Sequence, residues 1–108
     1  MTLQHCTLCP KACGADRTRT AGWCGGGAEM RAARAALHFW EEPCISGTGG
    51  AGAVFFSGCA LRCCFCQNRQ ISQEWFGKAI SVSQLSEILL RLQEQGAETL
   101  DLVTGSHY

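Results

Sequence analysis

The sequence predicts an α/β domain with one βαβ unit, preceded by an irregular, cysteine-rich lobe that binds metal. Three observations lead to this prediction. Residues 53–57 and 100–103 are short apolar runs typical of buried strands. Between them, residues 82–92 repeat apolar side chains every three or four positions, as an amphipathic helix does. The chain has nine cysteines in 108 residues, and those near the N-terminus indicate the metal-binding lobe.

The composition is that of one small globular domain, or of a piece of a larger one. Hydrophobic residues make up 46% of the chain, which is enough for a core. Nine Lys and Arg balance nine Asp and Glu, and this neutrality argues against nucleic acid or an acidic membrane surface as a partner. No apolar stretch is long enough to span a membrane, and the N-terminus does not have the pattern of a signal peptide.

Metal binding explains the cysteines better than disulfide bonds do. Their number is odd, and Cys63 and Cys64 are adjacent. Because no export signal is visible, we expect a cytoplasmic protein. In that reducing compartment, clustered thiols indicate metal binding or redox chemistry.

The N-terminal cysteines form a first candidate metal site. Their spacing is C-x2-C-x3-C-x10-C, on a backbone interrupted by Pro10, Gly14 and Gly22. Four thiolates can close a tetrahedral zinc site or hold a second iron–sulfur cluster, and this spacing does not separate the two. The ligands would be Cys6, Cys9, Cys13 and Cys24.

Residues 28–40 are predicted to form a short helix. They are rich in Ala, Arg and other good helix formers. Pro43 would end this helix, because the residue before a proline avoids the helical region. We therefore divide the chain into a cysteine-rich extension, residues 1–45, and a core, residues 46–108.

A glycine-rich segment leads into the first strand of the core. Residues 47–52 formally match G-x-G-x-x-G, but a dinucleotide-binding fingerprint must follow a strand and open a helix. Here the glycines precede the strand. We therefore expect a flexible connector rather than a nucleotide site.

The loop after the first strand carries the most informative pattern. In this three-cysteine loop (residues 57–68), Cys59, Cys63 and Cys66 are spaced C-x3-C-x2-C. Structural zinc prefers four protein ligands, whereas a 4Fe–4S cluster held by three thiolates leaves one iron open to a substrate. The pattern therefore indicates a reactive metal centre rather than a structural one. A metal centre would also order a connection that is unusually long for a compact domain.

The second half of the core completes the βαβ unit. Ser81 and Gln84 form the pattern of a capping box, and the helix that follows is expected to end before Gly96. Two strands joined through a helix are expected to be parallel, with a right-handed connection. Their carboxyl ends would bring the three-cysteine loop next to residues 104–108.

The three-cysteine loop resembles the cluster motif of radical S-adenosylmethionine (radical SAM) enzymes. The likeness rests on the C-x3-C-x2-C spacing with an aromatic residue, Phe65, before the last cysteine. The wider run of residues 55–72 is similar to the branch related to pyruvate formate-lyase activating enzymes. The N-terminal cysteines and their neighbours look like an extension found in that branch.

This resemblance implies that Cys59, Cys63 and Cys66 ligate a 4Fe–4S cluster and that SAM chelates its fourth iron. An electron from a flavodoxin- or ferredoxin-type reductant would cleave SAM to methionine and a 5′-deoxyadenosyl radical. A glycyl radical enzyme is the protein substrate that this branch suggests. The implied fold is a partial (β/α) barrel, of which 108 residues supply the N-terminal part only. We therefore expect a truncated core with impaired SAM cleavage.

Two other interpretations stay open. The first is a stand-alone iron–sulfur module for electron transfer, with all irons ligated and with Cys64 or an N-terminal cysteine as the fourth ligand. The second is an interaction domain stabilised by zinc. The sequence names neither the substrate nor the N-terminal metal.

Overall fold

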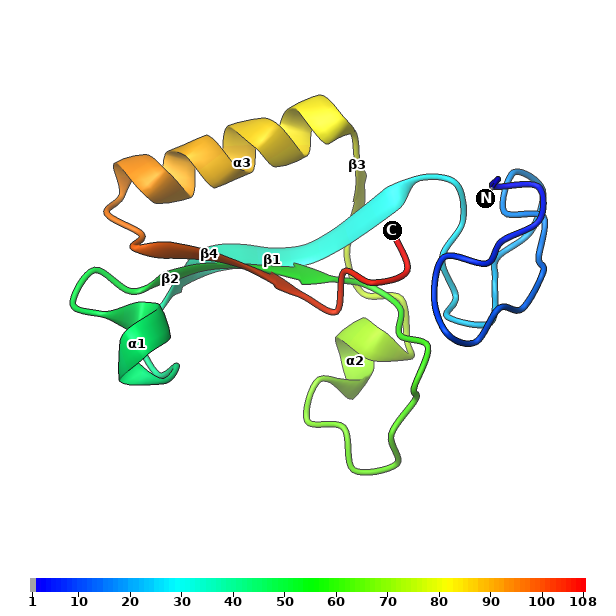
Figure 1. Ribbon diagram of the computed structural model, residues 1–108, viewed down its shortest axis with the longest axis horizontal. Helices are drawn as coiled ribbons and strands as arrows, with labels where there is room; N and C mark the ends of the chain where they lie inside the picture. The colour runs from blue at the N-terminus through cyan, green and yellow to red at the C-terminus, as the bar shows by residue number, and fades with distance from the viewer. Residues whose placement is uncertain (1) are drawn as a thin grey trace.

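The computed structural model describes residues 2–108 as a small mixed α/β domain built on one four-stranded sheet. The strand order is β3-β1-β2-β4. Helix α3 covers one face of the sheet, and the short helices α1 and α2 lie on the other side (Figure 1). In chain order the elements are β1 (Met30–His38), α1 (Pro43–Ser46), β2 (Ala51–Phe56), α2 (Arg69–Ser72), β3 (Lys78–Ile80), α3 (Val82–Glu94) and β4 (Thr99–Val103).

The two strands and the helix predicted for the core are observed. β2 and β4 pair in parallel, with Val54 opposite Leu102. The capping box at the start of α3 is confirmed: the Gln84 backbone N–H donates to Ser81 Oγ at 3.1 Å, and the Ser81 N–H donates to Gln84 Oε1 at 2.9 Å. Gly96, with φ at 102°, follows the end of the helix as expected.

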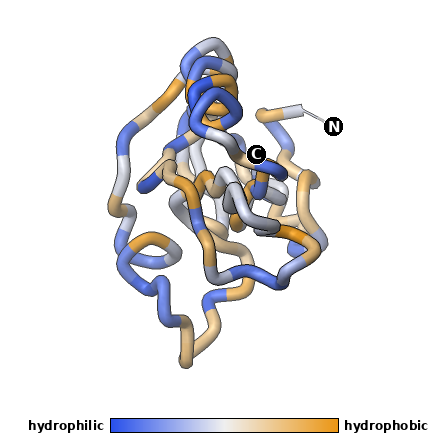
Figure 2. Tube along the Cα trace, turned by 90° about the vertical axis from the view of Figure 1, so that its left-hand side faces the viewer, coloured by the Kyte–Doolittle hydropathy of each residue, from blue (hydrophilic) through white to orange (hydrophobic). Residues whose placement is uncertain are grey.

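The core lies between α3 and the sheet. Val54 and Phe56 of β2 pack against Leu92 of α3, and all three side chains are buried. Hydrophilic and hydrophobic segments alternate along α3, at the top of Figure 2, as expected for a helix with one buried face. The helix therefore covers only the sheet face that carries Val54 and Phe56.

The helix predicted over residues 28–40 is wrong, because most of this segment is strand β1. β1 pairs antiparallel with β2, so that Ala35 faces Val54 and Ala36 faces Ala53, and its first residues pair antiparallel with β3. Helix propensity differs by only a few tenths of a kcal/mol between most residues, and pairing with two neighbouring strands outweighs it. The sheet therefore includes residues from both sides of the boundary that we drew at residue 45.

The glycine-rich segment before β2 is fixed by a carboxylate rather than left as a free connector. The backbone N–H groups of Thr48 and Gly49 each donate to Glu98 Oε1 at 2.8 Å. These hydrogen bonds stabilise the charged carboxylate and lower the pKa of Glu98 below its ordinary value of 4.5. The hydrogen bond from Gly49 has the largest effect on this pKa, followed by that from Thr48. A Cβ on Gly49 would lie 2.2 Å from the Gly96 carbonyl oxygen, so the close approach requires glycine.

The N-terminal lobe (residues 2–29) lies beyond one end of the sheet (Figure 1). It consists of turns and a single isolated bridge between Thr2 and His5. Across residues 2–108, none of the helices has the length and apolar character needed to cross a membrane.

Candidate metal centre

The three-cysteine loop leaves the sheet at the carboxyl end of β2. Because β2 and β4 are parallel and Phe55 lies opposite Val103, both strands end at the same edge. The loop projects away from this edge and returns through α2 (Figure 1). In open α/β sheets, ligands bind at this edge.

The three predicted ligands in this loop are free thiols. Cys59, Cys63 and Cys66 are half-buried, whereas Cys64 is exposed. Within residues 2–108, no three His, Cys, Asp or Glu side chains converge closely enough to hold one metal ion. A mononuclear site is therefore not preformed in the described part of the chain.

Helix α2 and the residue after it contact both the start and the returning half of the loop. The Gly58 N–H donates to the Ile71 carbonyl at 3.0 Å, and Gln73 Nε2 donates to the Cys63 carbonyl at 3.2 Å. Cys66 Sγ lies 3.4 Å from Ser72 Oγ. These contacts tie Gly58, Cys63 and Cys66 to α2 and to Gln73, the residue that follows it.

The N-terminal lobe holds the other half of the loop. The Cys59 N–H donates to the Cys24 carbonyl at 2.9 Å, and Trp23 Nε1 donates to the Ala60 carbonyl at 2.9 Å. The Arg62 guanidinium lies 4.6 Å from the centre of the Trp23 ring and donates to the Trp23 carbonyl. Trp23 and Cys24 thus connect the two groups of cysteines directly.

The C-terminal residues close the base of the loop, as the strand directions predicted. His107 Nε2 lies 2.9 Å from the Ser57 carbonyl oxygen, and the Tyr108 hydroxyl donates to the same oxygen at 3.2 Å. His107 is only 1% exposed, and this burial lowers the pKa of its imidazole below the ordinary value of 6.5. His107 is therefore neutral at pH 7 and supports the backbone two residues before Cys59.

Comparison with known proteins assigns this region to a family. A family model described as a 4Fe–4S single cluster domain matches residues 45–107. The chain belongs to this family. An uncharacterized protein of Methanocaldococcus jannaschii is 34% identical over 77 residues, which make up 71% of this chain and 22% of that protein. The chain thus spans about a fifth of the length of this relative. No solved structure gives a significant match.

The thiols of the three-cysteine loop suit the cluster of a 4Fe–4S single cluster domain. All cysteines of the matched residues 45–107 lie in this loop, so thiolate ligands from the matched segment must come from it. Each thiolate of a cubane binds a different iron atom, and the sulfur atoms stand farther apart than the ligands of a single ion. A loop without single-ion geometry is therefore compatible with such a cluster.

The four N-terminal cysteines lie outside the matched residues. Cys6 and Cys24 are buried, Cys9 is half-buried and Cys13 is exposed. Backbone hydrogen bonds from Trp23 and then Ala15 lower the pKa of the Cys13 thiol below its ordinary value of 9.0. The structure brings these cysteines into one lobe, but not to the distances of a single metal ion.

The iron–sulfur domain also has a polar depression that the sequence did not reveal. This hollow of about 580 Å³ lies beside the three-cysteine loop, on the sheet face that carries Phe55 and therefore opposite to the face of Val54 and Phe56. Arg34, Phe55 and Asp101 line it from three adjacent strands, and Gln67 and Asn68 line it from the loop. The sequence of β1 does not alternate polar and apolar residues, so no local pattern marks Arg34, and its position follows from the pairing with Phe55 of β2.

Proposed function

We propose that this chain is the cluster-binding part of a radical SAM protein, in which Cys59, Cys63 and Cys66 hold a 4Fe–4S cluster with one open iron. The observation that carries the proposal is the C-x3-C-x2-C set of free thiols at the carboxyl end of β2, inside the residues that match a 4Fe–4S single cluster domain. Three ligands to a four-iron cluster leave one iron for a substrate, and a fully ligated cluster would not.

The bound cluster would supply one electron for the reductive cleavage of SAM to methionine and a 5′-deoxyadenosyl radical. A low-potential carrier of the flavodoxin or ferredoxin type is the proposed source of that electron. Such oxygen-sensitive chemistry suits a reducing cytoplasm, where thiols stay free.

The residues of this chain would position the cofactors. α2 and the Trp23–Cys24 backbone hold the two halves of the three-cysteine loop, which fixes the spacing of the thiolates. The depression next to the loop is the surface that we assign to SAM. Asp101 offers an acceptor for amino or hydroxyl groups there, and Arg34 offers a donor for a carboxylate.

The complete SAM-dependent activity is proposed for a protein several times longer than this chain. The chain covers 22% of its Methanocaldococcus jannaschii relative, and a full barrel has about 200 residues or more. We therefore propose cluster binding for this chain, with SAM cleavage impaired. A glycyl radical enzyme is the proposed protein substrate of the complete enzyme, on the resemblance to pyruvate formate-lyase activating enzymes.

Single replacements of the loop cysteines test the ligand assignment. After anaerobic reconstitution with iron and sulfide, Cys59→Ala, Cys63→Ala and Cys66→Ala should each lose the absorbance and the iron of one 4Fe–4S cluster relative to the wild type. Cys64→Ala is the matched control, since it removes a thiol from the same loop and should retain both. Cys44→Ala controls for loss of a cysteine elsewhere.

Equal loss of iron in Cys64→Ala and Cys63→Ala would contradict the proposal. Cys64 would then be a fourth ligand, all irons of the cluster would be bound by protein, and electron transfer without SAM would be the better interpretation. Zinc bound in place of iron by the wild-type loop would instead support an interaction domain.

A further inference from the structure

The N-terminal lobe contains a second group of thiols, and hydrogen-bond donors are directed at two of their sulfur atoms. We propose that Cys6, Cys9, Cys13 and Cys24 form a second thiolate metal centre, separate from the cluster of the three-cysteine loop. The inference goes beyond the proposed function, because these residues lie outside the matched segment and a 4Fe–4S single cluster accounts for none of them.

Two of the thiols lie close together around a glycine. Cys13 Sγ and Cys24 Sγ are 3.5 and 3.6 Å from the position that a Cβ on Gly22 would occupy. A larger residue at position 22 would therefore contact both sulfur atoms, and glycine leaves this space for a ligand of the two thiols.

Two of the four sulfur atoms, those of Cys6 and Cys24, each have one hydrogen-bond donor nearby. The Gly26 N–H donates to Cys24 Sγ at 3.2 Å, and Arg17 Nη1 lies 3.8 Å from Cys6 Sγ. A neutral thiol is a weak acceptor, whereas a thiolate is an anion and accepts such bonds well. The Gly26 N–H and Arg17 are thus placed to donate to the sulfur atoms of Cys24 and Cys6 when these are bound to metal as thiolates.

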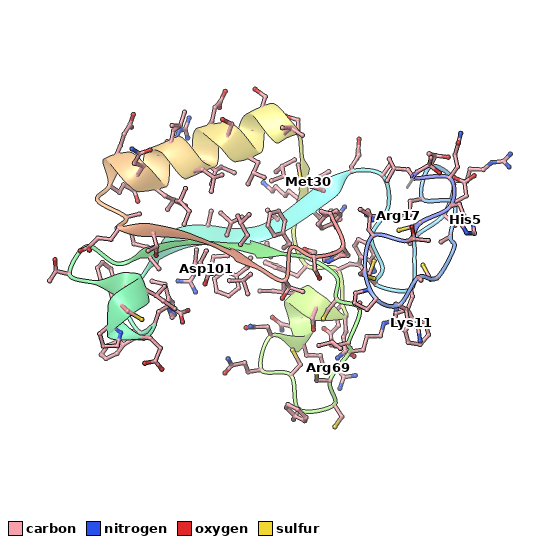
Figure 3. The ribbon with its side chains drawn as sticks, viewed as in Figure 1. His5, Lys11, Arg17, Met30, Arg69 and Asp101 are labelled. Carbon is pink, nitrogen blue, oxygen red and sulfur yellow. The ribbon has the colours of Figure 1, made fainter. Side chains whose placement is uncertain are left out.

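Arg17 supplies an independent observation. Its side chain is 3% exposed, and its guanidinium donates to the carbonyls of Gly27 and His107 and stands 5.4 Å from the centre of the Tyr108 ring. Figure 3 shows it inside the lobe, among the sulfur atoms. Of the carboxylates in residues 2–108, none forms an ion pair with it.

A buried cation without a counter-charge is strongly unfavourable. Four thiolates around zinc, or around an oxidised 4Fe–4S cluster, leave a net negative charge in the lobe. Such a centre next to Cys6 would provide the anion that Arg17 otherwise does not have. The metal would also order a lobe that has no helix and no long strand within residues 2–29.

The exposure of Cys13 makes the proposal testable on the native protein. Cys13 and Cys44 are both exposed, so folding alone protects neither. The protein, loaded with zinc in one sample and with iron and sulfide in another, is treated anaerobically with iodoacetamide, and the modified peptides are quantified by mass spectrometry.

In at least one of the two samples, we expect Cys13 to react about tenfold or more slowly than Cys44, until a chelator removes the metal. The sample in which Cys13 is protected identifies the centre as zinc or as an iron–sulfur cluster. Equal reactivity of Cys13 and Cys44 in both samples would overturn the proposal.

A triple variant separates this centre from the three-cysteine loop. Cys59→Ser, Cys63→Ser and Cys66→Ser together remove the proposed cluster ligands but should leave Cys13 protected. If the triple variant exposes Cys13 to alkylation while Cys44 reacts as before, the lobe has no centre of its own. Failure of the ligand assignment in the loop would instead appear as iron contents of the single loop variants equal to that of the wild type.

Discussion

Gly58 is the position where a single methyl group most directly tests how the lobe and the three-cysteine loop fit together. Its φ is +87°, in the region that glycine tolerates and other residues avoid. A Cβ at Gly58 would lie 2.6 Å from the Cys24 carbonyl oxygen, which accepts the hydrogen bond from the Cys59 N–H. Gly58→Ala must therefore strain the backbone and separate the loop from the lobe.

The expected cost has two parts. The positive φ costs an alanine roughly 1–2 kcal/mol. Displacing the Cys24 carbonyl breaks its 2.9 Å hydrogen bond to the Cys59 N–H, which contributes about 1 kcal/mol. The free energy of unfolding should therefore fall by about 2–3 kcal/mol. Because the broken bond lies next to a proposed ligand, the reconstituted protein should also lose iron faster.

Gly96→Ala is the matched control. Gly96 also has a positive φ, at 102°, but a Cβ there meets no atom within 4 Å. Both variants share the backbone strain and the reduced freedom of the unfolded chain. The difference between their free energies of unfolding therefore measures the contact between Gly58 and the lobe. Urea unfolding at matched metal content should place Gly58→Ala about 1 kcal/mol below Gly96→Ala. Equal stability of the two variants would refute the described contact.

Three further predictions concern the sheet and its surroundings. Leu92→Ala should lower the free energy of unfolding by about 2–5 kcal/mol, while Leu90→Ala on the exposed side of α3 should change it by less than about 0.5 kcal/mol; similar losses by chemical denaturation would contradict the assigned core. The folded-state pKa of Glu98 is depressed, so its charge stabilises the fold above pH 4.5 and this contribution disappears as pH falls through the folded value. The difference in free energy of unfolding between the wild type and Glu98→Gln should therefore shrink in acid. A difference that does not depend on pH would argue against the hydrogen bonds from Thr48 and Gly49 to the Glu98 carboxylate. Burial lowers the pKa of His107, because the charged imidazolium is disfavoured inside the protein. The free energy of unfolding should therefore decline as pH falls below 6.5, and an imidazole that titrates at or above pH 6.5 by NMR would contradict the burial of His107.

Local signals predicted the second half of the fold well. The capping box at Ser81, the apolar spacing of α3 and the glycine after it each depend on neighbours in sequence, and all three are observed. The meeting of the three-cysteine loop with the C-terminal residues followed from a general rule about parallel strands. His107 against Ser57 confirms that meeting.

β1 could not be predicted from local preference. Its alanines are good helix formers, and what makes the segment a strand is its pairing with β2 and β3, which lie far away in sequence. The error also hid the candidate binding surface, because only a strand brings Arg34 beside Phe55 and, across β2, to the face that carries Asp101. The burial of Arg17 could not be predicted from the sequence either, because it depends on hydrogen bonds to Gly27 and to His107 at the other end of the chain.

The central claim is that the cluster on Cys59, Cys63 and Cys66 keeps one iron open. The most direct test is electron paramagnetic resonance of the anaerobically reconstituted, reduced protein, recorded with and without SAM. Our account predicts a cluster spectrum that changes when SAM is added, and the change should be absent from Cys63→Ala. A four-iron cluster whose spectrum is the same with and without SAM would contradict the open site and indicate a fully ligated electron carrier.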